Sequence, residues 1–275
     1  MISRDIAYNR LDSAKIAAAR ERCTAVRSLS VVSETGSTNA DLLSTPLEIS
    51  EYPRVLLAEE QTQGRGRSGK TWASPSHLNV YMSVAWCWDQ PLRELAGISL
   101  ALGASVCVAL RDLLEVPVDV KWPNDLWIAD RKVAGILTES ARIANAHVLL
   151  VAGIGINVNM QPQHGEGIDQ AWTSLSQAAN KPLDRNKIAA CVLDAMLDAY
   201  DDFAVHGLAK TIKLWPKLDC FQDRDVELVN AGTTVIGVAR GIDDTGRLKV
   251  HTANGLIEVD SGEVSLRSRP DGGSS

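Results

Sequence analysis

The chain has 275 residues, 45% of them hydrophobic and 23% charged, which suits one large domain or a large domain with a small one. Its formal net charge of -6 argues against a general nucleic-acid-binding surface, because such surfaces attract phosphate with positive charge. The longest apolar segment, ISLALGASVCVAL, is shorter than the roughly 20 residues that span a bilayer, so we expect no membrane span.

The cysteines and the N-terminus indicate the compartment. The five cysteines are scattered and form no C-x-x-C pair, so neither a disulfide framework nor a zinc site is predicted. The first residues carry charges where a signal peptide would have an apolar run. We therefore expect reduced cysteines and a cytoplasmic protein.

The N-terminal part predicts helices and buried strands. Asp12–Val26 has an Ala-rich, helical composition. Residues 31–43 follow as a short strand, a turn and a helix, which Thr38 and Asp41 are expected to cap. Residues 54–60, RVLLAEE, predict a buried strand.

The middle of the chain adds a strand, a long helix and two further strand-like runs. Residues 78–86 alternate with a period of two, which predicts a strand with one buried face. Leu92–Leu114 is apolar nearly all round and predicts a helix that packs on a sheet. The strand-like runs Asp119–Trp122 and Val133–Glu139 surround an Asn-Asp turn.

Two more elements decide the fold class. Residues 147–159 predict another buried strand, and Asn186–His206 predicts an amphipathic helix. Helices are mixed with adjacent strands instead of alternating strictly with them. This order favours an α+β fold over a doubly wound α/β fold.

From about Lys217 the pattern changes to short strands alone. Five such runs are separated by hairpin-turn signals, among them Asn254-Gly255. They predict a small β-barrel in which the strands close on themselves. The expected organisation is a catalytic domain at 1–216, a barrel at 217–268 and a disordered tail at 269–275.

A glycine-rich stretch resembles two nucleotide-binding motifs. Gly64–Thr71 fits the P-loop pattern G-x-x-x-x-G-K-[ST], and its glycines also fit G-x-G-x-x-G. Both motifs need a helix that opens at the last glycine, but Pro75 and the strand after it leave no room for one. The stretch is interpreted as a loop in which Arg65, Arg67 and Lys70 clamp an anion, because glycines let the backbone approach a ligand. A solvated basic loop is the alternative.

A second constellation is KWPND, residues 121–125, followed by Lys132, Gly135 and a GIGIN run that ends at Asn157. KWPND alone could be a polar β-turn. Together with the basic loop, however, the set resembles the biotin protein ligases, the biotin–acetyl-CoA-carboxylase ligases of bacteria. The resemblance runs from about Asp12 to Arg267 and includes GSTNADLL, AEEQTQGRGRSGKTWASP, KWPNDLWIADRKVAGIL, GIGINVN and GEVSLRS.

The resemblance implies a fold and an activity. The fold would be a mixed sheet with helices like that of class II aminoacyl-tRNA synthetases, plus a small C-terminal SH3-like β-barrel. The enzyme would join biotin to ATP as biotinyl-5′-AMP, releasing pyrophosphate, and pass biotin to a lysine of a biotin carboxyl carrier protein. ATP with Mg²⁺ and biotin are then the substrates, with no tightly bound prosthetic group. No nucleic acid or membrane partner is expected, and a homodimer is left open.

The resemblance also implies the site residues. The expected catalytic residues are Lys132, Arg67 and Asp125. Lys132 would stabilise the carboxylate and α-phosphate, and Asp125 would either coordinate Mg²⁺ or take a proton from the incoming lysine. Biotin would contact Ser37, Thr38, Gln61, Arg65, Arg67, Lys132, Gly135 and Ile136. ATP would contact Arg67, Lys70, Trp72, Asn124, Asp125 and Asn157.

Further positions and alternatives belong to the same resemblance. Glu263 and Arg267 match family positions close to the active site, or are ordinary edge-strand charges. Ser68 replaces an Arg that some members carry, and His77 is interpreted as a loop histidine without a ligand. The alternatives in function are a lipoate-type ligase of the same fold, and the ligase half of a bifunctional ligase and repressor of biotin genes. No cysteine falls in a motif, unlike in the related octanoyltransferases.

Overall fold

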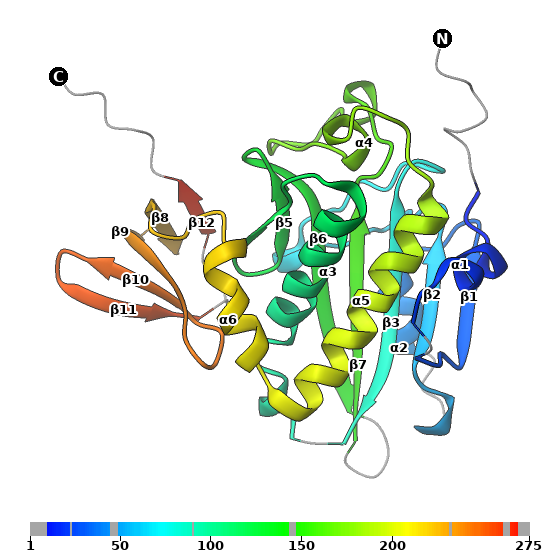
Figure 1. Ribbon diagram of the computed structural model, residues 1–275, viewed down its shortest axis with the longest axis horizontal. Coiled ribbons are helices and arrows are strands. Elements are labelled where there is room, and N and C mark those ends of the chain that lie inside the picture. Colours follow the sequence, from blue (N-terminus) through cyan, green and yellow to red (C-terminus); the bar gives the residue numbers. More distant parts are fainter. Residues whose placement is uncertain are drawn as a thin grey trace.

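The computed structural model of the chain describes residues 10–260 and 265–268, apart from residues 23, 45–48, 90, 143–146 and 231–232. Within this part, the chain forms a seven-stranded sheet with helices packed on it and a separate five-stranded sheet (Figure 1). The predicted tail at 269–275 lies outside the described residues.

The larger sheet is mixed. Its strand order is β1-β2-β3-β7-β6-β5-β4. The strands are β1 (Ser28–Val32), β2 (Arg54–Ala58), β3 (Val80–Trp88), β4 (Asp119–Lys121), β5 (Asp125–Ile128), β6 (Arg131–Arg142) and β7 (Val148–Ile156). β1 is parallel to β2, and the other neighbouring pairs are antiparallel. The α+β prediction is confirmed, because a doubly wound fold would have a mostly parallel sheet.

Helices pack on both faces of this sheet. The helices of the described part are α1 (Ser13–Ala19), α2 (Thr38–Ser44), α3 (Ile98–Leu114), α4 (Leu175–Ala178), α5 (Arg185–His206) and α6 (Ala209–Leu218). There are also 3-10 turns at Ile49–Glu51, Arg67–Gly69, Leu92–Leu95 and Pro162–His164. Figure 1 shows α3 and α5 lying across one face, where the main core forms. On the other face Leu42 of α2 packs with Ala85 and Val151 in a smaller cluster. The prediction that β3 has one buried face is therefore wrong, since both are buried.

The apolar stretch Leu92–Leu114 forms the core helix that the sequence predicts. Within the described residues it is the one stretch that is long and apolar enough to cross a membrane. A buried core helix has the same length and composition. Here Gly97, with a φ of 85°, separates a 3-10 turn from α3, and α3 packs against α5 and the sheet. Packing in the core accounts for the apolar composition.

The first helix is shorter than predicted. α1 ends at Ala19, whereas the composition predicts a helix to Val26. The reason is tertiary: the carboxylate of Asp194 on α5 accepts hydrogen bonds from the backbone nitrogens of Glu21 (2.9 Å) and Arg22 (3.1 Å). In a longer helix these two backbone nitrogens would donate to backbone carbonyls four residues earlier. The contact with Asp194 therefore overrides the helix propensity of the sequence.

The smaller sheet has the strand order β11-β10-β9-β8-β12. Its strands are β8 (Asp225–Asn230), β9 (Thr233–Ile242), β10 (Leu248–Thr252), β11 (Gly255–Val259) and β12 (Ser265–Ser268). The five strands confirm the sequence prediction, but the sheet is not closed into a barrel. Among the described residues β11 pairs with β10 alone and β12 with β8 alone, so the two edges never meet as closure requires. The sheet contacts the larger one through Trp122, whose Nε1 donates to the Gly246 carbonyl at 3.1 Å.

A buried carboxylate links α6 to the segment that leads into the smaller sheet and makes the stability depend on pH. Asp219 is 8% exposed and accepts hydrogen bonds from Trp215 Nε1 and Phe221 N, both at 2.9 Å. Burial raises the pKa of Asp219 from 3.8 to about 6, and the two hydrogen bonds offset part of that rise. Since the folded-state pKa lies above the unfolded one, the Asp219 contribution is complete below about 3.8 and is lost as pH rises through 6.

The variant Asp219→Asn tests this dependence. Relative to that variant, the unmodified chain is expected to gain about 2 kcal/mol in unfolding free energy between pH 7 and pH 4, because one pKa unit is about 1.4 kcal/mol. Urea unfolding of both proteins across this range measures the difference. A difference that stays constant with pH would contradict the assignment.

Candidate active site

The glycine-rich loop is a narrow backbone turn that contains no α-helix. Its start is attached to the segment before α2, since Thr62 N donates to Thr35 O and Gln63 N to Gly36 O. Further on, Arg65 and Thr71 form a β-bridge. The nearest helical feature is the 3-10 turn Arg67–Gly69. The expectation that neither a P-loop nor a dinucleotide-binding helix follows these glycines is confirmed.

The catalytic pair expected from the sequence is brought together on β5 and β6. Lys132 Nζ lies 2.8 Å from Asp125 Oδ1, and the two side chains are 14% and 18% exposed. The antiparallel pairing sets Asp125 opposite Gly135, with a register shift between Lys132 and Ala134. A Cβ at Gly135 would lie 3.2 Å from Lys132 Cε and 3.3 Å from Asp125 Oδ1, so glycine leaves room for the pair.

Two more predicted residues lie beside this pair. The Trp72 ring centroid is 5.2 Å from Lys132 Nζ. The Arg67 guanidinium is half-buried, and desolvation lowers its pKa while the charge of Asp125 raises it. Asn124 Nδ2 donates to the Ile136 carbonyl at 2.7 Å, which turns Asn124 Oδ1 toward Arg67 Nη1 at 3.5 Å. Two cations thus surround one carboxylate, which suits an anionic ligand.

The GIGIN run supplies the floor under Trp72. A Cβ at Gly155 of β7 would lie 2.5 Å from the Trp72 indole, so that ring rests on bare backbone. Trp72 Nε1 is buried and has no hydrogen-bond partner in the described part of the chain. The face of Trp72 that Gly155 supports is therefore fixed, as a stacking platform requires.

A second polar cluster forms where α2 begins, next to the loop. Gln61 Oε1 accepts from Thr38 N at 3.0 Å, and the Thr38 hydroxyl lies 2.7 Å from Ser83 Oγ. Ser37 directly precedes α2 and accepts weakly from Ala40 N at 3.5 Å. The predicted Thr38 and Asp41 cap is therefore wrong by one residue, because the Thr38 side chain faces Gln61 and Ser83 instead.

Other predicted residues lie apart or are committed elsewhere. Lys70 is exposed at the loop tip. Asn157 is 5% exposed and donates from Nδ2 to the Thr173 carbonyl at 3.0 Å. The Ile136 side chain faces Gly103 of α3, so only its backbone can reach the site. Glu263 lies outside the described residues, and Arg267 lies on β12 opposite Glu227.

The donor set does not build a metal site of its own. The described residues contain no group of three or more His, Cys, Asp or Glu side chains that could hold a metal ion. Asp125 stands alone, and its Oδ1 is engaged by Lys132. Because Mg²⁺ in nucleotide enzymes is commonly held by one or two carboxylates together with substrate phosphates, the ion belongs with ATP as substrate.

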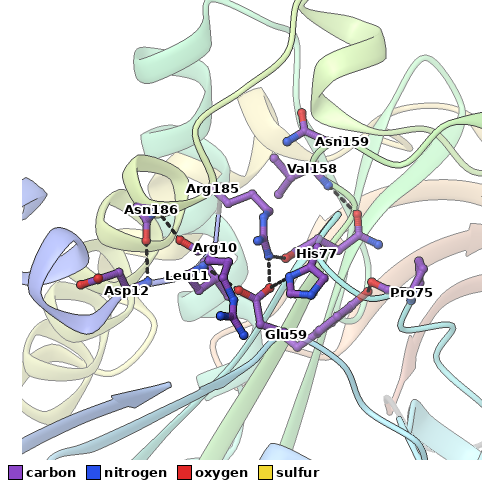
Figure 2. Close-up of polar contacts among 12 residues, drawn as sticks. Arg10, Leu11, Asp12, Glu59, Pro75, His77, Val158, Asn159, Arg185 and Asn186 are labelled. Atoms are coloured by element: carbon purple, nitrogen blue, oxygen red, sulfur yellow. Dashed lines mark hydrogen bonds and ion pairs between the residues drawn. The ribbon is translucent and has the colours of Figure 1, made fainter. Parts of the chain in front are cut away.

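A buried ion pair that the sequence does not reveal lies where the loop leaves the sheet. Glu59, at the end of β2, lies 2.7 Å from Arg185 Nη1 of α5 and 3.2 Å from His77 Nδ1 (Figure 2). Its other oxygen accepts from Leu11 N at 2.7 Å. His77 lies where the loop returns to the sheet, and its backbone nitrogen also donates to the Glu59 carbonyl at 3.4 Å. The interpretation of His77 as a loop histidine without a ligand stays a prediction. Arg185 follows an N-cap Asp at the start of a helix, which gives no signal of this partner.

The fold is that of a class of ligases. Residues 31–159 match the Biotin/lipoate A/B protein ligase family, and residues 224–267 match the Biotin protein ligase C terminal domain. The bifunctional ligase/repressor BirA of Salmonella typhimurium is 38% identical over 84% of this chain and 72% of its own length. The biotin–[acetyl-CoA-carboxylase] ligase of Mycobacterium tuberculosis is 35% identical over 86% of this chain and 88% of its own length.

A solved structure agrees with these relatives. The biotin protein ligase from Aquifex aeolicus in complex with biotin and ATP superposes with a TM-score of 0.74 at 30% identity, covering 88% of this chain and 99% of that one. The chain belongs to the biotin protein ligase family. The resemblance that the sequence motifs indicate is therefore confirmed.

Proposed function

We propose that the chain activates biotin with MgATP to form biotinyl-5′-AMP and then transfers biotin to a lysine of a biotin carboxyl carrier protein. The observation that carries the proposal is the cluster of Lys132, Asp125, Arg67 and Trp72 beside the glycine-rich loop. The two cations would neutralise the biotin carboxylate and the phosphates of ATP, the Asp125 carboxylate would hold Lys132, and the Trp72 ring would stack on the adenine. Because the reaction consumes ATP, the same proposal places the protein in the cytoplasm.

In the first step two anions have to meet. A biotin carboxylate oxygen attacks the α-phosphorus of ATP, and the bond to pyrophosphate breaks. Lys132 Nζ, which Asp125 already holds at 2.8 Å, would stabilise the charge that develops on the α-phosphate. Arg67 would hold the phosphates, since a planar guanidinium can bind two oxygens at once. Arg65 is ion-paired with Glu139 at 3.6 Å and would exchange that partner for the ligand.

In the second step the carrier lysine attacks the carbonyl carbon of the mixed anhydride. An amide forms, AMP leaves, and the amine loses a proton. A free lysine has a pKa near 10.4 and is mostly protonated at neutral pH, so a base or desolvation is needed. Asp125 would accept this proton, while Mg²⁺ arrives with the phosphates of ATP.

Release of pyrophosphate from MgATP tests the first step and separates the alternatives. Biotin is expected to support release, whereas lipoate and octanoate supplied in parallel are not. Release with lipoate in place of biotin would move the chain to a lipoate-type activity. No release with any of the three acids would refute the adenylation step.

A narrower test concerns the floor under Trp72. Gly155→Ala places a methyl group 2.5 Å from the indole, so Trp72 has to move. Because the displaced ring no longer presents the surface on which adenine would stack, the KM for ATP is expected to rise, roughly 10-fold for a loss of about 1.4 kcal/mol in binding, while the KM for biotin changes less. Gly103→Ala is the matched control, since a Cβ there meets Ile136 at an ordinary 3.7 Å. Equal changes in both KM values for Gly155→Ala would argue against an adenine platform.

DNA-binding repression is a second function to test, because the Salmonella typhimurium relative is named a bifunctional ligase/repressor. The net charge of -6 opposes it. A gel-shift titration with DNA from a biotin-gene promoter, repeated at rising salt, measures it directly. Binding that depends on biotin and ATP would add repression to the ligase activity.

A further inference from the structure

A continuous chain of polar side chains lies under the glycine-rich loop. It runs from Gln61 through Thr38, Ser83 and Asn39 to Glu139, and ends at Arg65. Ser83 is fully buried and Asn39 is 4% exposed, so the start of α2 is joined to β3 and to β6 inside the fold. Asn39 also fills the space over Gly153, where a Cβ would lie 2.2 Å from its oxygen.

The orientation of Asn39 follows from what faces it. One end of its amide lies 2.8 Å from Glu139 Oε2 and 3.1 Å from the Leu137 carbonyl, and both of these groups are acceptors. A carboxylate and a carbonyl can only accept, so this end must be the Nδ2 group. The opposite end is therefore Oδ1. Ser83 Oγ, at 2.6 Å, has to donate its single proton to it.

That assignment determines the next hydroxyl. Because the Ser83 proton is used on Asn39, the 2.7 Å contact between Ser83 and Thr38 requires Thr38 to donate. The Thr38 hydroxyl also lies 3.1 Å from Gln61 Oε1, but one proton cannot serve both contacts. The Thr38 proton therefore goes to Ser83, because that contact is the shorter one and the orientation of Asn39 requires it.

Gln61 is oriented independently of this chain. Its Oε1 accepts from Thr38 N at 3.0 Å, and its Nε2 donates to Ser74 Oγ at 3.3 Å, whose proton in turn goes to the Trp72 carbonyl. Two acceptor oxygens, Thr38 Oγ1 and Gln61 Oε1, are thus left 3.1 Å apart with no proton between them. An N–H group of a ligand that points between them would satisfy both.

We propose that Ser83, Asn39 and Glu139 are positioning residues that fix the Thr38 hydroxyl as an acceptor and thereby select a ligand with an N–H donor. The inference rests on the proposed function, since the ureido ring of biotin carries two such groups. Without Ser83, the Thr38 hydroxyl would turn to donate to Gln61, and the pair would offer a ligand one acceptor fewer. A site built to bind an N–H group discriminates strongly against an analogue that lacks it.

The test is isothermal titration of the full chain with biotin and with its two cyclic carbamates, in each of which a ring oxygen replaces one ureido N–H. Ser83→Ala is expected to weaken biotin binding about 10-fold, the upper range for one neutral hydrogen bond, and to change binding of one carbamate by less than about 2-fold. Ser105→Ala is the matched control, because its hydroxyl donates to the Ala195 carbonyl away from this chain. It should leave all three affinities unchanged.

Glu139→Gln is the second variant, to be used if Ser83→Ala fails to fold, because the Glu139 side chain is 27% exposed. The amide of the new Gln side chain can donate as well as accept, so Asn39 could turn over and the same changes in affinity are expected. An equal loss for biotin and both carbamates would overturn the proposal, because it would indicate packing alone. Unchanged biotin binding in both variants would overturn it as well. A failure of the unmodified chain to bind biotin at all would instead refute the proposed function on which it rests.

Discussion

Lys132→Ala is expected to lower the rate of biotin-dependent pyrophosphate release at least about 100-fold, the usual effect of removing one preorganised donor to a developing negative charge. The ammonium is held by Asp125 at 2.8 Å and is 14% exposed, so little water is available to replace it. The loss should fall on kcat more than on the KM for either substrate, because the charge on the α-phosphate develops in the transition state.

Steady-state pyrophosphate release at saturating biotin and MgATP measures this loss. Lys181→Ala, which removes an exposed lysine elsewhere, is the control and should keep the original rate. Adding Asp125→Asn to Lys132→Ala is expected to recover stability, since it neutralises a carboxylate that has lost its ion-pair partner at 2.8 Å, but not the rate. A Lys132→Ala enzyme with nearly the original kcat would remove Lys132 from the reaction.

Arg185→Met is expected to lower the free energy of unfolding by about 3–5 kcal/mol, as breaking a buried ion pair from one side commonly does. The Arg185 side chain is fully buried and donates to Glu59 Oε2 at 2.7 Å and to the Asn79 carbonyl at 3.0 Å. Without it, the Glu59 carboxylate, which is 3% exposed, loses the guanidinium that Figure 2 shows bonded to it.

Urea unfolding monitored by tryptophan fluorescence measures this change. The double variant Glu59→Gln with Arg185→Met should recover part of the loss, because a neutral amide costs less to bury than a carboxylate. Arg240→Met is the comparison, since its pair with Asp223 is about half exposed and should contribute less than about 1 kcal/mol. Equal losses for Arg185→Met and Arg240→Met would show that burial of the pair has no special consequence.

The parts of the fold that local patterns specify are predictable from the sequence. The apolar run of α3, the helical period of α5 and the five short C-terminal strands, of which β8 to β11 are joined by hairpins, need only neighbouring residues to be recognised. The absence of a helix after the glycine-rich loop is also local, because Pro75 follows so closely. Helix α6 is not predicted, because Pro216 interrupts the helical pattern of its sequence. In the structure Pro216 lies in the last turn of the helix.

The features that sequence does not reveal depend on distant partners. The end of α1 is decided by Asp194, roughly 170 residues away, and the burial of the second face of β3 by α2. In the site, Lys132 and Asp125 are close in sequence and share a hairpin, which makes their pairing predictable. Asn39 and Glu139 are 100 residues apart, and neither residue type alone indicates the other.

The glycines of β7 are a feature of the local sequence that indicates two of these distant contacts. Gly153 and Gly155 alternate on a buried strand, where glycine normally weakens the sheet. Each leaves space for a site side chain, Asn39 in one case and Trp72 in the other. Alternating glycines in such a strand therefore indicate that two side chains approach its backbone closely.

Transfer of biotin to a carrier protein is the most direct test of the proposed ligase activity. The chain is incubated with biotin, MgATP and a purified biotin carboxyl carrier domain, and the intact mass of the carrier is measured. One biotinyl group is expected on the carrier, absent when its acceptor lysine is replaced by arginine and strongly reduced with the Lys132→Ala enzyme. A carrier that stays unmodified while biotin and ATP are bound would contradict the assignment of this chain as a working biotin protein ligase.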